Sequence, residues 1–314
     1  MSRIRKRPVV LAIGIFDGVH LGHRAILKKA VREAGHLRAE AAALTFPSHP
    51  SRVLHPDRPV PLMQTFEQRC RAIRSCGIKK IFALHFSRRL SKLGPVEFVD
   101  RVLFRHWNLR GVVVGRNFRF GHGRCGDVED LRRLLAPRAA SVWGVGPVRS
   151  GGRTIQSTVI RRKLVSGRPD DARRMLGRAV VLTGVVRKGA GMGVKLGART
   201  VNLKLRNELL PKFGVYAGWI GASKVASSPS RRPFRPVVIN LGIAPTVHRG
   251  REVLLEAHVL DGRRVSFKPG AVLNVEMDRF LRSERKFSTV RALGRAIQKD
   301  VRRARQILRR GRSV

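Results

Sequence analysis

The sequence predicts two domains: an α/β domain with a doubly wound parallel sheet, then a small antiparallel β-barrel domain with a C-terminal helix. Three observations predict this. In the first half of the chain, short apolar runs alternate with amphipathic segments; in the second half, strand-like runs follow one another without a long helix between them; and the chain ends in a basic amphipathic stretch. A length of 314 residues suits two domains that each bury a core. We place the boundary so that the domains span residues 1–178 and 179–314.

The strands expected in the first domain are continuous runs of Val, Ile, Leu and Ala. Runs of this kind are typical of parallel strands that are covered on both faces. The predicted strands are residues 9–16, 41–46, 80–86 and 111–115, and the predicted helices are residues 21–35, 65–77 and 95–107. Strands that alternate with helices in this way indicate a doubly wound sheet.

The second domain is expected to be a barrel because its strands lie close together in the sequence. The predicted strands are residues 180–186, 214–220, 236–242, 253–260 and 272–277. Residues 226–236, rich in Ser, Pro and Arg, are expected to form a loop. Residues 288–308 place Val290, Leu293, Ile297, Val301 and Ile307 at helical spacing, which predicts a basic amphipathic helix that packs on the barrel.

The charge of the chain raises the question of a nucleic-acid partner. There are 66 Lys and Arg residues against 20 Asp and Glu, a formal net charge of +46. The basic excess is spread through both halves, and one Tyr and three Trp offer few rings on which bases could stack. We therefore predict a solvated basic surface and no specific nucleic-acid partner, while nonspecific binding to polyanions stays open.

The cellular location is predicted from the cysteines and the apolar runs. Cys70, Cys76 and Cys125 form no CxxC pair and no even disulfide set, which favours a reducing compartment, and we expect a cytoplasmic protein. The N-terminal basic residues and apolar run are not read as a secretion signal, because Asp17 ends the run and no small-residue cleavage site follows. No stretch approaches the roughly 18 to 20 apolar residues of a membrane helix, so no membrane partner is expected.

The stretch GIFDGVHLGH, residues 14–23, places two histidines where a strand is expected to meet a helix. Such a turn offers free backbone N–H groups and the positive end of the helix dipole, and glycines let a phosphate approach the backbone. His20 and His23 could then donate hydrogen bonds to oxygens that gain negative charge during phosphorus chemistry. The alternative is that they only pack or cap the helix. A metal pair is disfavoured, because no Cys/His cluster at ligand spacing stands nearby.

Four segments in order resemble those of a known family. GIFDGVHLGH resembles the N-terminal signature of the HxGH nucleotidyltransferase superfamily. Together with three further segments, it resembles the bifunctional prokaryotic riboflavin kinase/FAD synthetases. These segments are LTFPSHP (44–50), VVVGRNFRFGHGRCGD (112–127) and IQSTVIRRKLVSG (155–167). The likeness continues through GMGVKLGARTVNL (191–203), GVYAGWI, NLGIAPTV (240–247), LLEAHVLD (254–261) and FLRSERKF (280–287).

For the first domain the resemblance implies adenylylation of FMN by ATP, giving FAD and pyrophosphate. The residues implied are His20, His23 and Arg161 in catalysis; Gly14, Phe16, Asp17, Gly18, Gly22, Ser157 and Thr158 at the nucleotide; and His49, Asn117, Phe118 and Phe120 at the flavin. From the residues alone, Ser157 and Thr158 could equally cap a helix beside a solvated Arg161, and Phe118 and Phe120 could equally belong to the core.

For the second domain the resemblance implies a riboflavin kinase that uses Mg²⁺ and ATP to make FMN. Thr200 and Asn202 are the implied metal ligands, Glu256 the general base, and Gly191, Gly193, Lys195 and Gly197 the nucleotide loop. By pattern alone, Glu256 could instead be an outward-facing residue of a half-exposed strand. The chain departs from the family pattern at Arg199, where proline is usual, at Val194, where a basic residue is common, and at Gln156, in place of serine.

Two other functions are weighed against the bifunctional enzyme. One is an adenylyltransferase whose kinase-like domain is inactive, which the departures near Thr200 would allow. The other is a nonspecific nucleic-acid-binding protein on a relic enzyme fold, which the net charge would allow. Because the histidines, Arg161, Thr200, Asn202 and Glu256 are all present, we favour the enzyme with both activities, whose partners are riboflavin, FMN and ATP.

Overall fold

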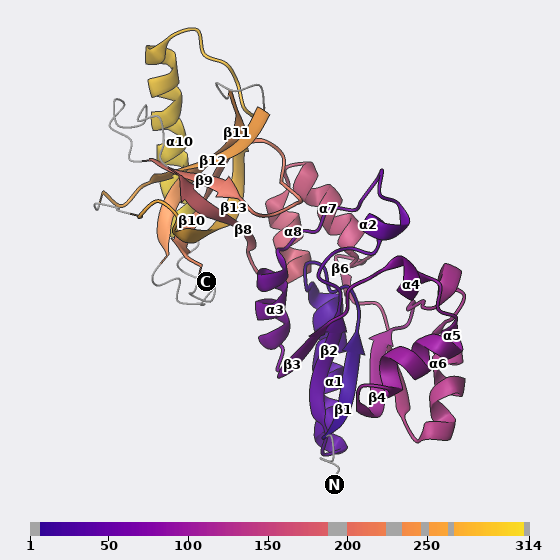
Figure 1. Cartoon of the computed structure of the whole chain (residues 1–314). Helices are drawn as coiled ribbons and strands as arrows, with labels where there is room; N and C mark the ends of the chain where they lie inside the picture. The colour runs from indigo at the N-terminus through magenta and orange to yellow at the C-terminus, as the bar shows by residue number, and fades with distance from the viewer. Residues whose placement is uncertain (1–6, 188–199, 224–233, 246–250, 263–266, 311–314) are drawn as a thin grey trace. The chain divides into compact units, whose positions relative to one another are not determined.

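The structure, a computed structural model, describes residues 7–187, 200–223, 234–245, 251–262 and 267–310. The chain divides into two compact units, residues 1–157 and 158–314 (Figure 1). Residues 158–178, which the sequence assigns to the first domain, group with the second unit by their contacts. The functional boundary between residues 178 and 179 stays a prediction.

The first unit is built on a five-stranded sheet in the order β3-β2-β1-β4-β5, in which every neighbouring pair is parallel. Its strands are β1 (Pro8–Ile13), β2 (Glu40–Thr45), β3 (Lys80–Ala83), β4 (Asn108–Gly115) and β5 (Ser141–Val145). Its helices are α1 (Leu21–His36), α2 (Ser51–Leu54), α3 (Phe66–Arg74), α4 (Arg88–Ser91), α5 (Pro95–Phe98), the π-helical η1 (Val99–Phe104), η2 (His122–Arg124), α6 (Val128–Leu135) and η3 (Ala136–Arg138). A two-stranded hairpin, β6 (Arg149–Ser150) and β7 (Arg153–Thr154), follows. The predicted parallel sheet is confirmed.

Two separate apolar cores cover the two faces of this sheet. Successive residues of β1 point to opposite faces, so that Leu11 packs in the core with η1 and α6, and Val10 packs in the core with α1. Both side chains are fully buried. This double burial is the physical reason why β1, β2 and β4 are continuous apolar runs in the sequence.

The second unit is a closed six-stranded antiparallel barrel in the order β10-β11-β12-β9-β8-β13. Its strands are β8 (Val180–Arg187), β9 (Thr200–Leu205), β10 (Gly214–Ala222), β11 (Arg235–Pro245), β12 (Arg251–Val259) and β13 (Val272–Arg282). Helices α7 (Ser157–Val165) and α8 (Pro169–Leu176) precede the barrel, and α10 (Val290–Arg310) follows it. The predicted barrel with a C-terminal helix is confirmed, and β9 is an additional strand that the sequence reading did not find.

Helix α10 lies against the barrel wall (Figure 1). Ala304 and Leu308 are buried in one cluster with Trp219 and Val238 of the barrel, and Val301 and Ile307 pack partly buried beside them. An ion pair between Asp300 and Arg282 at 2.8 Å also links the helix to β13. The amphipathic pattern therefore does place one helix face on the barrel.

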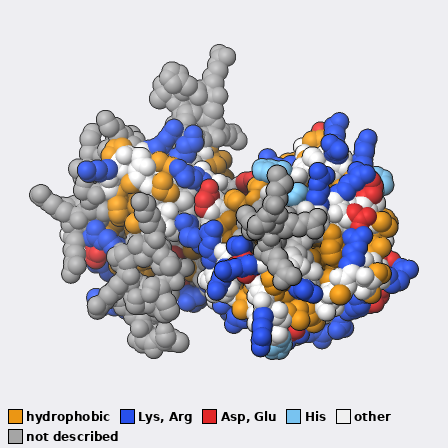
Figure 2. Space-filling model, turned by 60° about the horizontal axis from the view of Figure 1, so that its bottom comes forward, with side chains coloured by type: hydrophobic (Ala, Val, Ile, Leu, Met, Phe, Trp, Pro, Cys, Tyr) orange, Lys and Arg blue, Asp and Glu red, His pale blue; other side chains and the backbone are white. Residues whose placement is uncertain are grey.

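Many basic side chains lie on the surface of the protein. Figure 2 shows Lys and Arg side chains over both units, with few Asp and Glu side chains among them. No helix within the described ranges has the length and apolarity needed to cross a membrane.

Candidate active sites

The turn between β1 and α1 brings the two histidines face to face. His20 is the N-cap of α1: its Nδ1 accepts a hydrogen bond from the backbone N–H of His23 at 3.2 Å. The two imidazole rings stack with centroids 3.7 Å apart and planes 18° from parallel. His20 therefore caps the helix through Nδ1.

The backbone of this turn is strained at residues that carry side chains. Phe16 and Val19 adopt φ angles of 51° and 37°, in the left-handed region that such residues rarely occupy. Both are fully buried or nearly so, and this packing holds the conformation in place. The Phe16 ring meets the His23 ring edge-on, with centroids 5.4 Å apart. The strained turn thus places the Phe16 ring against the imidazole of His23.

Two glycines of the motif make room for these rings. A Cβ atom on Gly22 would lie 3.1 Å from Cε1 of His20, and a Cβ atom on Gly14 would lie 3.0 Å from the Phe16 ring. A side chain on Gly22 would therefore crowd the His20 ring. Contact of Gly14, Gly18 and Gly22 with phosphate stays a prediction.

Asp17 joins the turn to two other segments. Its buried carboxylate accepts a hydrogen bond from the backbone N–H of Met63 at 3.0 Å, and its carbonyl oxygen accepts one from the hydroxyl of Ser157 at 2.9 Å. Ser157 is the first residue of α7, and the same helix carries Thr158, which is exposed, and Arg161, which is half-buried. The S-T-x-x-R segment therefore starts at the histidine turn.

Arg69 is a site residue that the sequence did not suggest. It is fully buried on α3, and its guanidinium donates to the carbonyl oxygens of Ile15, Phe46 and Pro47 at 3.1, 2.6 and 2.7 Å. These carbonyls follow β1 and β2, in the turn that leads to His20 and in the T-F-x-x-H-P segment. One planar cation thus fixes two loops at the carboxyl edge of the sheet. Because an arginine is normally exposed, the residue type did not indicate that Arg69 is buried.

The predicted flavin residues lie in two loops of the first unit. Nδ1 of His49 lies 2.8 Å from the Ser51 hydroxyl and accepts the Ser51 backbone N–H at 3.1 Å. Asn117 is exposed, Phe118 is half-buried, and Phe120 is buried in the core. The rings of Phe118 and Phe120 stack with centroids 5.8 Å apart. Core packing therefore accounts for the position of Phe120, and flavin contact of these residues stays a prediction.

In the barrel, strand pairing gathers the predicted kinase residues. Glu256 on β12 lies directly opposite Asn202 on β9, and His258 lies opposite Thr200. Because side chains alternate along a strand, these four share one face, while the intervening Ala257 is fully buried on the other. Glu256 is half-buried and faces the outside of the barrel; its role stays a prediction. His258 was not singled out by the sequence.

Asn202 carries an atom that suits a cation. Its Oδ1 is buried and accepts no hydrogen bond from the residues that the structure describes. Those residues also contain no group of three or more His, Cys, Asp or Glu side chains that could hold a metal. An amide oxygen beside a carboxylate fits a magnesium ion that takes its remaining ligands from water and nucleotide phosphates. The predicted nucleotide loop, Gly191, Gly193, Lys195 and Gly197, lies outside the described residues, as do Val194 and Arg199.

Comparison with known proteins decides the family. Residues 2–159 match the FAD synthetase family and residues 176–308 match the riboflavin kinase family. A protein of Pseudomonas fluorescens named bifunctional riboflavin kinase/FMN adenylyltransferase is 31% identical over 305 residues, which cover 97% of this chain and 94% of that protein. The chain belongs to this family. A member from Listeria monocytogenes is 30% identical over 293 residues, which cover 93% of this chain and 90% of that protein.

The whole fold of this bifunctional family member has a solved counterpart. A crystal structure from Streptococcus pneumoniae, described as a macrolide-efflux protein, superposes with a TM-score of 0.83 at 25% identity and covers 97% of this chain and 95% of that one. The protein is thus an enzyme with an N-terminal FAD synthetase domain and a C-terminal riboflavin kinase domain. The reading as a bifunctional enzyme is confirmed, and the two alternatives are not supported.

Proposed function

We propose that the turn of His20 and His23 is where FMN is adenylylated. An FMN phosphate oxygen attacks the α-phosphorus of ATP, the bond from this phosphorus to the bridging oxygen breaks, and pyrophosphate leaves. The observation that carries this proposal is the position of His20, which caps α1 at its N-terminus and stacks on His23; we assign its Nε2 as a donor to the reacting phosphate. Donors fixed before the reaction stabilise the charge that develops on the phosphoryl oxygens.

The other residues of the first domain take supporting roles in this proposal. Ser157, Thr158 and Arg161 bind the leaving pyrophosphate, for which a guanidinium offers a fork of donors. The Ser157 bond to Asp17 supports this assignment, because it brings the start of α7 to the turn. His49, Asn117, Phe118 and Phe120 bind the flavin.

The outer face of the barrel is the proposed kinase site. Glu256 removes the proton from the terminal ribityl hydroxyl, whose oxygen attacks the γ-phosphorus of ATP; the bond from this phosphorus to the β,γ-bridging oxygen breaks, and ADP leaves. Oxygens of Thr200 and Asn202 would hold Mg²⁺, which neutralises charge on the ATP phosphates when bound. The register that places Asn202 opposite Glu256 supports this proposal.

The domain boundary belongs to the same proposal. The two family matches end at residue 159 and begin at residue 176, so α7 and α8 lie between the matched regions or at their ends. We assign residues 1–178 to adenylyl transfer and residues 179–314 to the kinase, because α7 starts at the histidine turn.

The test is a pair of incubations of the purified chain with ATP and Mg²⁺, one with riboflavin and one with FMN, followed by separation of the flavins over time. We expect FMN and then FAD in the first, and FAD in the second. Omitting Mg²⁺ should abolish FMN formation. FAD in the second incubation, with neither FMN nor FAD formed in the first, would mean that the kinase site is inactive.

A further inference from the structure

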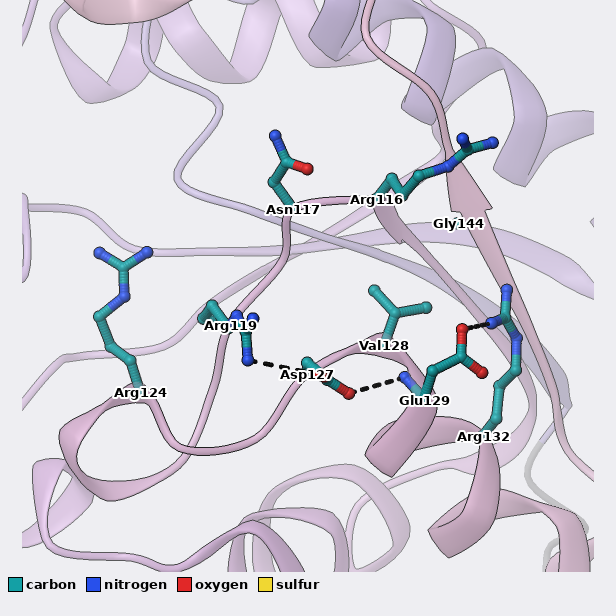
Figure 3. Close-up of a pocket in the computed structure, with 9 residues that line it drawn as sticks. All are labelled: Arg116, Asn117, Arg119, Arg124, Asp127, Val128, Glu129, Arg132 and Gly144. Carbon is teal, nitrogen blue, oxygen red and sulfur yellow. Dashed lines mark hydrogen bonds and ion pairs between the residues drawn. The ribbon is translucent and has the colours of Figure 1, made fainter.

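Most carboxylates of this basic chain are paired with a basic side chain. Figure 3 shows such a pair in the first unit, where Glu129 on α6 contacts Arg132. Two carboxylates of the second unit differ. Among the residues that the structure describes, Glu256 and Glu284 have neither a hydrogen bond nor an ion pair. One of the two is the proposed base of the kinase site, and the other has no role in that proposal.

Glu284, in the loop after β13, lies against Gly242 of β11. A Cβ atom on Gly242 would overlap the carboxyl group of Glu284 and lie 2.5 Å from its Cδ, so this group fills the space of the missing side chain. Glu284 as a residue is exposed, yet its carboxyl group covers a buried glycine. Burial raises the pKa of Glu284 above its usual value, although the charge of Arg282 opposes the shift. A carboxylate that loses water without gaining a partner is unfavourable, so this position suits a partner that arrives with a substrate.

The loop that carries Glu284 is held in place by Arg282. The Arg282 guanidinium donates to the Asp300 carboxylate at 2.8 to 3.2 Å and to the carbonyl oxygen of Ser283 at 3.1 Å. Its Cζ atom also lies 5.7 Å from the ring centroid of Phe287. Because Arg282 is bound to Asp300, it fixes the loop and leaves the Glu284 carboxylate available as an acceptor.

Gly242 and Glu256 share the outer face of the barrel. Glu256 lies directly opposite Asn240 on β11, and Gly242 follows Asn240 by two residues, so both β11 positions face outward. Leu241 between them is fully buried on the inner face. Positions that are diagonal across an antiparallel pair lie roughly 7–8 Å apart. The carboxylate of Glu284 is therefore separated from the proposed base by about the length of a short carbon chain.

Riboflavin carries donors that suit this carboxylate. Its ribityl chain has secondary hydroxyl groups beside the terminal one, and a carboxylate accepts hydrogen bonds on both oxygens. We propose that Glu284 is a specificity-determining residue of the kinase, which accepts hydrogen bonds from the secondary hydroxyls and so presents the terminal hydroxyl to Glu256. Position 242 is a glycine so that this carboxylate can lie against the sheet. The inference rests on the proposed kinase site around Glu256.

The test compares riboflavin with an analogue in which an unbranched 5-hydroxypentyl chain replaces the ribityl chain. The analogue keeps the chain length and the reacting hydroxyl and lacks the secondary hydroxyls. For each flavin, kcat/KM is measured with ATP and Mg²⁺ on the full chain, and Kd is measured by fluorescence anisotropy. The variants are Glu284→Ala, Gly242→Ala and the double variant. The controls are Glu208→Ala, an exposed carboxylate of the same unit, and Gly294→Ala, where nothing lies within 4 Å of the added Cβ atom.

We expect kcat/KM and affinity for riboflavin to fall about tenfold or more in Glu284→Ala and in Gly242→Ala, while the values for the analogue stay within about twofold. Because both changes displace the same carboxylate, the double variant should lose no more than either single variant. Unchanged riboflavin values in Glu284→Ala would overturn the proposal, as would an equal fall for both flavins or additive effects of the two changes. A raised Mg²⁺ requirement as the main effect would also overturn it, because the carboxylate would then act on the metal.

Failure of this inference is distinguishable from failure of the proposed kinase site. Full riboflavin phosphorylation by Glu256→Gln would remove the site from this face of the barrel. An inactive Glu256→Gln together with unchanged riboflavin values in Glu284→Ala would keep the site and remove only the role of Glu284. Thermal unfolding of each variant shows whether the barrel is folded at the temperature of the assay.

Discussion

Asn202 and Glu256 are direct cross-strand neighbours in the barrel wall, and both face away from its interior. The proposed base thus stands beside a buried amide oxygen that accepts no hydrogen bond from the described residues. A carboxylate and an amide oxygen on one rigid sheet keep their separation without help from a loop.

Glu256→Gln tests the general base. The amide keeps the shape of the side chain and cannot take a proton, so we expect riboflavin phosphorylation to fall roughly 100-fold or more, while FAD formation from FMN is unchanged. The control is Glu208→Gln, an exposed carboxylate of the same unit. Full FMN formation by Glu256→Gln would exclude Glu256 as the base.

His20 combines two roles that a pair of variants can separate. In His20→Asn, Oδ1 can still accept the His23 N–H, but the outer donor is lost; in His20→Gln, the amide nitrogen can replace Nε2, but the cap is lost. We expect the Asn variant to unfold at nearly the wild-type temperature and to form FAD roughly 100-fold more slowly. The Gln variant should lose about 1 kcal/mol of unfolding free energy and keep more activity.

Riboflavin phosphorylation serves as the internal control for both His20 variants, because it is assigned to the other domain. A full rate of FAD formation in His20→Asn would mean that His20 only caps α1.

Arg69 is expected to position the adenylyl-transfer loops without touching substrate. Arg69→Lys cannot reach all three carbonyls, and the buried acceptors left over should cost roughly 2–3 kcal/mol of unfolding free energy. At temperatures where the variant is folded, kcat for FAD formation should still fall, with riboflavin phosphorylation spared. Arg71→Lys, on the exposed side of α3, is the matched control. Loss of stability with unchanged kcat would reduce Arg69 to a purely structural residue.

Gly218 on β10 is a position where the barrel tolerates no side chain. An added Cβ atom would lie 2.1 Å from the backbone oxygen of Glu276 on β13, at a point where the register of the two strands shifts. Gly218→Ala should therefore lower the unfolding free energy by about 1–3 kcal/mol. Gly294→Ala, in α10 with nothing within 4 Å of the added atom, should raise it by up to about 1 kcal/mol. Thermal unfolding measures both, and equal effects of the two changes would contradict this account.

The sequence predicted what depends on local pattern. The buried strands β1, β2 and β4 follow from their apolar runs, and the histidine turn follows from residues that are adjacent in the chain. Strand β9 was missed although Thr200–Leu205 alternates polar and apolar residues, the pattern of a strand with one exposed face, because the segment was interpreted only as a ligand motif. Edge strand β5, only five residues long with an internal Gly144, gave too short a pattern. Helix α6 was missed as well.

The sites could be predicted only in part for a related reason. The neighbourhood of Asn202 and Glu256 depends on the register of strands that are distant in sequence, and no local signal sets it. Arg69 was missed because burial of a charge depends on the carbonyls that surround it. The packing role of Gly22 depends on the ring that fills the space beside it.

Residues with two different roles alternate along strand β12. Leu255, Ala257 and Val259 face inward and hold the barrel together, while Glu256 and His258 face outward beside Asn202 and Thr200. Substitutions of the inward-facing residues should therefore be tolerated when side-chain volume is kept. Substitutions of the outward-facing residues should be tolerated only when the functional group is kept. A single inserted residue in this strand would exchange the two sets, so that one mutation would place a carboxylate in the core and a leucine in the proposed kinase site.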